Sequence, residues 1–95
     1  MTNRPELTRE ELGRALTRAQ RRRITDGELL PGDVAALRRF ICLTQEEFAA
    51  ALGISVHTLR NWEQDRVTPR GSGLALLRIA ARHPRIIREN LESAG

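Results

Sequence analysis

A run of side chains able to form hydrogen bonds occupies residues 55–64. When these residues are placed on a helix at about 100° per residue, most of the polar groups gather on one side. Leu59 and Trp62 fall on the opposite side, which would face a protein core. The polar side and its edges comprise Val56, His57, Thr58, Arg60, Asn61 and Gln64, whereas Ser55 falls on the side of Leu59 and Trp62.

These side chains carry the donors and acceptors needed to read base edges in the major groove of DNA. Asn61 and Gln64 can pair bidentately with adenine, and Arg60 can bind guanine or a phosphate. Val56 can contact a thymine methyl group, and Gln45 can direct its amide at a phosphate. An ordinary solvated helix face is the alternative, and the capping and apolar patterns around the run disfavour it.

Two short helices joined by a tight turn are predicted to position this face. Thr44 and Glu47 form a capping box at the start of the first helix, and Gly53 supplies the turn. Ser55 caps the second helix, which is expected to end near Gln64. The side chains that the first helix should bury are Phe48, Ala49 and Leu52. The pattern predicts a helix-turn-helix, whose second helix enters the major groove.

Further helices are expected on both sides of this pair. One runs from residue 31 or 33 to residue 41, Ser72 could cap a helix over residues 73–82, and Pro84 fits the first turn of the last helix. The first of these helices places Val34, Leu37 and Ile41 on one face, and the apolar side chains of the last helix are Ile86, Ile87 and Leu91. Because no strand pattern is present, the predicted fold is all-α, with a five-helix domain over residues 30–95.

An N-terminal helical extension is expected over residues 1–29. Thr8 and Glu11 form a capping box, and the helix should continue to about Arg23. Gly27 then separates this segment from the domain that follows. The amphipathic stripe of the helix consists of Leu12, Ala15, Leu16 and Ala19.

Composition limits the class of protein. A length of 95 residues allows one domain, and all 16 basic residues are arginine, with a net charge of +4. Such an excess favours a nucleic-acid partner, although a GC-rich genome would also explain the absence of lysine. Cys42 is the single cysteine, which excludes an internal disulfide. Because neither a signal sequence nor an apolar run of about 20 residues is found, we expect a soluble, cytoplasmic protein.

No group of residues indicates catalysis, so we expect no enzyme. Arg38 and Glu63 have no nucleophile or second acid beside them and fit a structural ion pair between helices. His57 and His83 are too far from other ligands in the sequence to predict a metal site. We expect neither a metal nor an organic cofactor.

The combined motifs resemble the phage-repressor/Cro-type (XRE) helix-turn-helix family over residues 30–87. The later part of the resemblance, which runs from Asn61 to Pro84, is closest to the HigA/MqsA-like antitoxin branch. The motifs that carry the resemblance are Arg38, residues 43–49, Gly53, residues 58–64, Pro69, residues 76–80 and Pro84. The resemblance implies a lambda-repressor-like fold and a homodimer that represses transcription at a palindromic operator.

The resemblance also implies roles for individual residues and for a protein partner. Arg38 should pair with Glu63, and the DNA-facing positions should be Gln45, Ser55, His57, Thr58, Arg60 and Asn61. Many members of the branch bind a RelE/HigB-like toxin, so the chain is interpreted as the antitoxin of a type II toxin–antitoxin module that represses its own operon. The alternatives are a stand-alone regulator of phage or mobile-element type, and an interaction module that has lost DNA binding.

Three positions depart from the family pattern. His57 stands where relatives usually carry arginine, so the base contact should differ and DNA affinity could depend on pH. Cys42 and Asp65 stand where the family favours glycine at helix ends. Glycine adopts the left-handed conformation there at little cost, whereas aspartate tolerates it moderately and cysteine poorly. Slightly altered helix ends are therefore expected.

Several features allow more than one interpretation. Trp62 is predicted to be a core residue and Cys42 a buried or half-buried thiol. The basic run 21–23 is either a DNA-contacting arm or a solvated helix end. The N-terminal helix is favoured as the toxin-binding element through Leu12, Leu16 and Ala19, over a dimer contact or a part of the core. The C-terminal apolar helices are favoured as the dimer surface.

Overall fold

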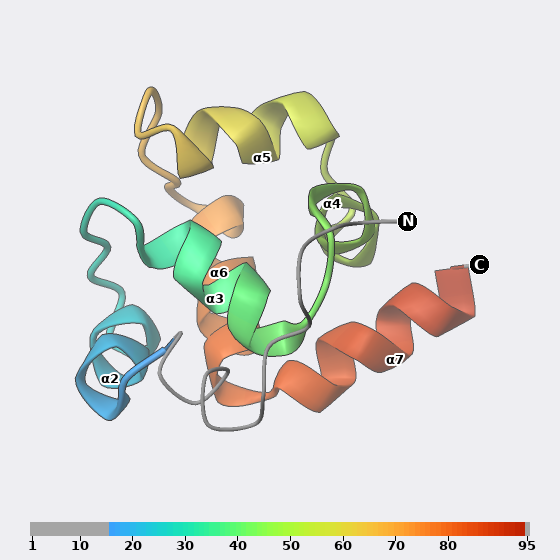
Figure 1. Cartoon of the computed structure of the whole chain (residues 1–95), viewed down its shortest axis with the longest axis horizontal. Helices are drawn as coiled ribbons and strands as arrows, with labels where there is room; N and C mark the ends of the chain where they lie inside the picture. Colours follow the sequence, from blue (N-terminus) through green and yellow to red (C-terminus); the bar gives the residue numbers. More distant parts are fainter. Residues whose placement is uncertain (1–15, 95) are drawn as a thin grey trace, which may run out of the picture.

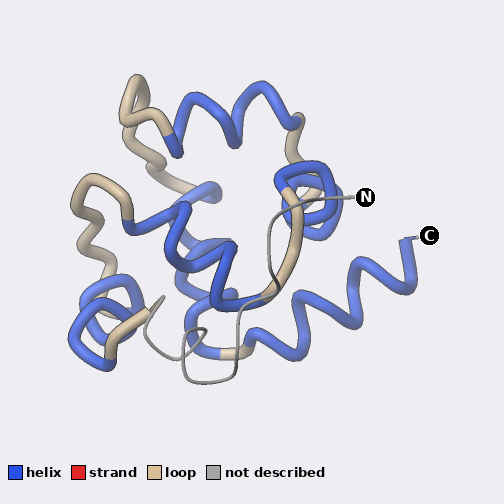
Figure 2. Tube along the Cα trace, in the orientation of Figure 1, coloured by secondary structure: helices blue, strands red, loops and turns tan. Residues whose placement is uncertain are grey.

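A computed structural model of the chain describes residues 16–94. This part of the chain is built of helices and loops, with no strand among the described residues (Figures 1 and 2). The predicted all-α class is therefore confirmed. The helices are α2 (Arg18–Thr25), α3 (Asp33–Ile41), α4 (Gln45–Leu52), α5 (Val56–Glu63), α6 (Ser72–Arg82) and α7 (Pro84–Ala94).

The helix-turn-helix consists of α4 and α5, and its local signals are confirmed. The Thr44 hydroxyl accepts from the backbone N–H of Glu47 at 3.1 Å, and the Glu47 carboxylate accepts from the N–H of Thr44 at 2.9 Å. Gly53 ends α4 in the left-handed conformation, with φ 74°. The Ser55 hydroxyl then accepts from the N–H of Thr58 and caps α5. Each signal depends on residues at most four positions apart, which is why the sequence shows it.

All described helices contribute to one aliphatic core. Phe48 of α4, Leu37 of α3, Leu59 of α5 and Leu77 of α6 are fully buried, and Trp62 is also in the core at 7% exposure. In α7, Ile87 is buried, whereas Ile86 is exposed. The burial expected for Phe48, Ala49, Leu52 and Trp62 is thus confirmed.

The predicted helix from Thr8 to about Arg23 is wrong where the structure can test it. Thr17 is extended, with φ −73° and ψ 163°, and it caps a new helix that begins at Arg18. Its hydroxyl accepts from the N–H of Gln20, whose side chain accepts in return from the N–H of Thr17. This capping box interrupts any helix that would cross Leu16. Residues 1–15, including the expected cap and Leu12, lie outside the described part.

α2 is bound firmly to the rest of the domain. The Arg21 guanidinium donates to the carbonyl of Ala81 at 2.7 Å, and Arg78 donates to the carbonyl of Thr25 at 2.9 Å. Arg23 forms an ion pair with the buried Asp33, and its hydrogen bond to this carboxylate raises the pKa of Arg23 above the usual value. The expected domain boundary at residue 30 therefore does not coincide with a break in packing.

The last two helices differ from the expectation in one detail. α6 begins with Ser72 as its first residue and has no side-chain cap, because its N-cap residue is Gly71, which has no side chain. Pro84 opens α7 as predicted. Among the described residues, none of the helices has the length and apolar character that a membrane crossing requires.

Cys42 and Asp65, just past the ends of α3 and α5, adopt the left-handed conformation although neither is glycine. Their φ angles are 67° and 60°, and they are the non-glycine residues with positive φ in the described part. The expected alteration of the helix ends is therefore wrong: the backbone keeps the geometry that glycine would favour. Cys42 is also exposed and not buried as expected, because a residue just past the end of α3 points to solvent.

Replacing Cys42 by glycine should stabilise the protein. Glycine removes the clash of Cβ with the backbone at φ 67°, and we expect the free energy of unfolding to rise by about 0.5–1 kcal/mol. Denaturant unfolding of the variant measures this change. Cys42→Ala is the matched control, since it removes the thiol but keeps Cβ; an equal gain in both variants would contradict the role of the backbone angle.

Candidate nucleic-acid interface

α5 lies along one side of the molecule, away from α7 (Figure 1). One side of the helix carries Leu59 and Trp62 into the core, and the Cβ position of Gly73 would lie only 2.9 Å from the Trp62 ring. The other side carries exposed His57 and Arg60. The absence of a side chain at Gly73 therefore lets the Trp62 ring lie against the start of α6.

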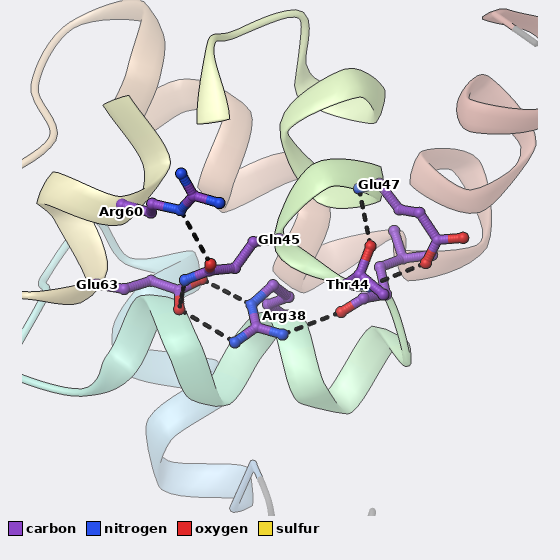
Figure 3. A network of polar contacts seen from close by, with 7 residues as sticks. Arg38, Thr44, Gln45, Glu47, Arg60 and Glu63 are labelled. Atoms are coloured by element: carbon purple, nitrogen blue, oxygen red, sulfur yellow. Dashed lines mark hydrogen bonds and ion pairs between the residues drawn. The ribbon is translucent and has the colours of Figure 1, made fainter. Parts of the chain in front are cut away.

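An ion pair between Arg38 of α3 and Glu63 of α5 lies beneath this surface (Figure 3). The Arg38 Nε donates to Glu63 Oε2 at 2.7 Å and its Nη2 donates to Glu63 Oε1 at 3.1 Å, a two-point contact. Nη1 donates in addition to the carbonyl of Leu43. The side chains are 16% and 7% exposed, so the pair is largely removed from water. It therefore fixes α3 against α5 and the start of α4.

Gln45 connects this ion pair to the surface. Its Nε2 donates to Glu63 Oε1 at 3.1 Å, and its Oε1 accepts from Arg60 Nε at 3.3 Å (Figure 3). Because a carboxylate can only accept, the NH₂ group of Gln45 must face Glu63. The amide oxygen then faces Arg60, so the amide nitrogen is not directed at a phosphate as the sequence led us to expect.

Arg60 has a second partner on α4. Its Nη2 donates to Glu46 Oε2 at 3.2 Å, and the two side chains are 47% and 67% exposed. Sequence reasoning missed Glu46 because it lies on a different helix from Arg60, and no spacing rule relates the two positions. An arginine expected to meet DNA is thus already held by two acceptors on α4.

The remaining predicted residues also contact one another. The Ser55 hydroxyl donates to the Thr58 hydroxyl at 2.9 Å, and the Asn61 amide nitrogen lies 3.3 Å from His57 Nε2. A hydrogen bond from the Asn61 amide to His57 requires that Nε2 of His57 carries no proton. Gln64 is exposed just past the end of α5. The structure therefore joins six of the predicted residues in three pairs: Gln45 with Arg60, Ser55 with Thr58, and His57 with Asn61.

Other predicted positions lie apart from this surface or are less accessible. Val56 is half-buried against the core, which restricts its reach toward a thymine methyl. Of the positions expected to bind a toxin, Leu16 is buried in the core at 5% exposure, Ala19 is exposed on α2, and Leu12 lies outside the described residues. Leu16 and Ala19 therefore do not share one face of a single helix, as the expected stripe would require.

The helix-turn-helix geometry agrees with a comparison against known families. Residues 43–77, from just after α3 to the middle of α6, match the helix-turn-helix family model. Over these residues the chain is similar to helix-turn-helix proteins. The match includes both α4 and α5 and therefore the surface that carries Arg60 and Asn61.

Curated relatives share this region of the chain. Antitoxin HigA-2 of Vibrio cholerae is 37% identical over 54 residues, which make up 57% of this chain and 52% of the relative. The uncharacterized HTH-type transcriptional regulator YiaG of Escherichia coli K12 is 32% identical over 60 residues, or 63% of this chain and 62% of the relative. The chain thus spans about half to three fifths of these relatives. No solved structure gives a significant match.

Removing the carboxylate of Glu63 should destabilise the fold. Glu63→Ala leaves the largely buried Arg38 guanidinium without its counter-ion, and we expect the free energy of unfolding to fall by about 2–3 kcal/mol. Urea unfolding measures the loss. The control is Glu46→Ala, which removes an exposed carboxylate from Arg60 and should cost less than about 1 kcal/mol. Equal losses for the two variants would contradict the central role of the Arg38–Glu63 pair.

Proposed function

We propose that this protein is a sequence-specific transcriptional repressor that reads duplex DNA with the exposed side of α5. The observation that carries the proposal is the cluster of donors and acceptors on that side, with His57 and Arg60 exposed. Leu59 and Trp62 hold the helix on the core, so the polar side faces outward. A protruding helix of this kind fits the major groove, where base edges present a distinct hydrogen-bonding pattern.

The DNA complex would be formed by a homodimer on a palindromic operator. Two copies of α5 would lie about 34 Å apart, one helical turn of DNA. Ser55 and the backbone N–H of Gln45, at the start of α4, would set the register against phosphates, and His57, Thr58, Arg60 and Asn61 would select bases. Because arginines supply the positive charge, affinity should fall steeply as salt rises.

We propose further that the repressor is the antitoxin of a type II toxin–antitoxin module. The likeness to HigA-2 over 54 residues supports this role, because that relative is itself named an antitoxin. The partner would be a RelE/HigB-like toxin, and the complex would repress its own operon. The likeness to YiaG supports the alternative, a regulator that acts without a toxin.

Replacing Asn61 should weaken DNA binding without unfolding the protein. Asn61→Ala removes an amide from the exposed side of α5, and we expect the affinity for the operator to fall by about 1–3 kcal/mol. Fluorescence anisotropy with the duplex that the wild-type protein selects from a random pool measures the change. Asn90→Ala makes the same substitution on α7 and should leave the affinity for DNA unchanged. Wild-type affinity in Asn61→Ala would show that α5 reads DNA through other groups.

Co-expression with the product of the adjacent gene tests the antitoxin role. We expect a small basic protein from that gene to copurify with this chain and to lose its growth inhibition in the complex. The measurement is affinity purification followed by a growth assay of the adjacent product with and without this chain. If the adjacent product is neither bound nor toxic, the stand-alone regulator is the correct function.

A further inference from the structure

The side edge of the Arg60 guanidinium is already occupied in the free protein. Nε donates to Gln45 Oε1 and Nη2 donates to Glu46 Oε2, so two acceptors from α4 hold two adjacent nitrogens. A guanidinium carries five N–H donors in a planar fork. The contacts therefore leave both hydrogens of Nη1 and one hydrogen of Nη2 available at the far end of the fork.

The two holders are themselves fixed in place. Gln45 cannot turn its amide without losing the hydrogen bond from Nε2 to Glu63, and Glu63 is held by two donors of Arg38. Glu46 lies in the first turn of α4, where the helix dipole favours a carboxylate. Figure 3 shows the terminal nitrogens of Arg60 projecting beyond the contact with Gln45. The free end of the fork is thus directed by the fold and not only by the rotamer of Arg60.

We propose that Glu46 and Gln45 position Arg60 so that the end of its guanidinium reads a guanine. Guanine presents O6 and N7 side by side in the major groove, and a planar fork with two parallel donors matches that pair. A phosphate can be contacted by a mobile arginine from many directions, so holding the fork brings little benefit there. The proposal rests on the proposed function, since it assigns a base preference to the same side of α5.

The negative charge of Glu46 adds a second effect on selectivity. Its carboxylate is 67% exposed beside Arg60, so it disfavours close approach of phosphates. An Arg60 that stays paired with Glu46 is also less available for phosphate contacts on unrelated DNA. Glu46 should therefore raise the affinity for a duplex with a correctly placed guanine relative to the affinity for other duplexes. It should do so although DNA repels its negative charge.

Glu46→Gln separates positioning from simple repulsion. The first probe is the duplex that the wild-type protein selects from a random pool, and the second is a scrambled duplex. In a third set, single guanines of the selected duplex are replaced by an analogue that lacks the N7 acceptor. We expect the preference of the variant for the selected duplex over the scrambled one to fall by about two- to fivefold, the range of an exposed charged contact. The penalty for one analogue substitution should shrink by a similar factor.

Glu47→Gln is the matched control. It makes the same change of charge at the neighbouring position and keeps a side chain able to close the capping box with Thr44. Glu47 forms no hydrogen bond with Arg60, whose carboxylate partner is Glu46. Its preference between duplexes should equal that of the wild type. In an Arg60→Ala background, Glu46→Gln should have no further effect on the preference, because Glu46 acts through Arg60.

The outcomes distinguish this proposal from the function on which it rests. If Glu46→Gln and Glu47→Gln raise binding to every duplex by the same factor, Glu46 acts by repulsion alone and the positioning role is overturned. An effect of Glu46→Gln that persists without Arg60 overturns it as well. In both cases a wild-type preference for the selected duplex leaves the DNA-reading function intact. Only a wild-type protein without any preference would overturn both.

Discussion

The ion pair between Arg38 and Glu63 is the interaction on which the rest of this structure depends. Its two-point contact at 2.7 and 3.1 Å joins α3 to α5, and the third donor of Arg38 reaches the Leu43 carbonyl just before α4. Because the pair is largely shielded from water, breaking it would leave a charge with poor solvation. Glu63 also orients Gln45, so the same buried carboxylate determines how the surface at Arg60 is presented.

Several arginines serve the fold and not an external partner. Arg21 donates to the carbonyl of Ala81, Arg78 to that of Thr25, and Arg88 to that of Ile41. Each carbonyl belongs to the last turn of a helix, where backbone acceptors lack partners and cations are favoured. The arginine excess that points to nucleic acid therefore has a second origin. Charge alone is a weaker argument for DNA binding than the exposed groups on α5.

The accuracy of the sequence interpretation followed the range of the interactions, with the start of α2 as an exception. The capping box of Thr44 and Glu47 was predictable because both partners lie within one helical turn. The start of α2 was missed because the apolar stripe around Leu16 outweighed an equally local capping box at Thr17. Glu46 was missed for a different reason: its contact with Arg60 joins two helices, and only their packing creates it.

The sequence by itself determined the helical class, the turn at Gly53, the buried side of α5 and the set of polar residues opposite it. These features follow from helical periodicity and from bonds within a few residues. The tertiary structure alone decided which of these groups are held by others, and in which direction. It placed Arg60 between Gln45 and Glu46 and joined α2 to α6. Such contacts depend on how separate helices pack against one another, and no local pattern of residues specifies that packing.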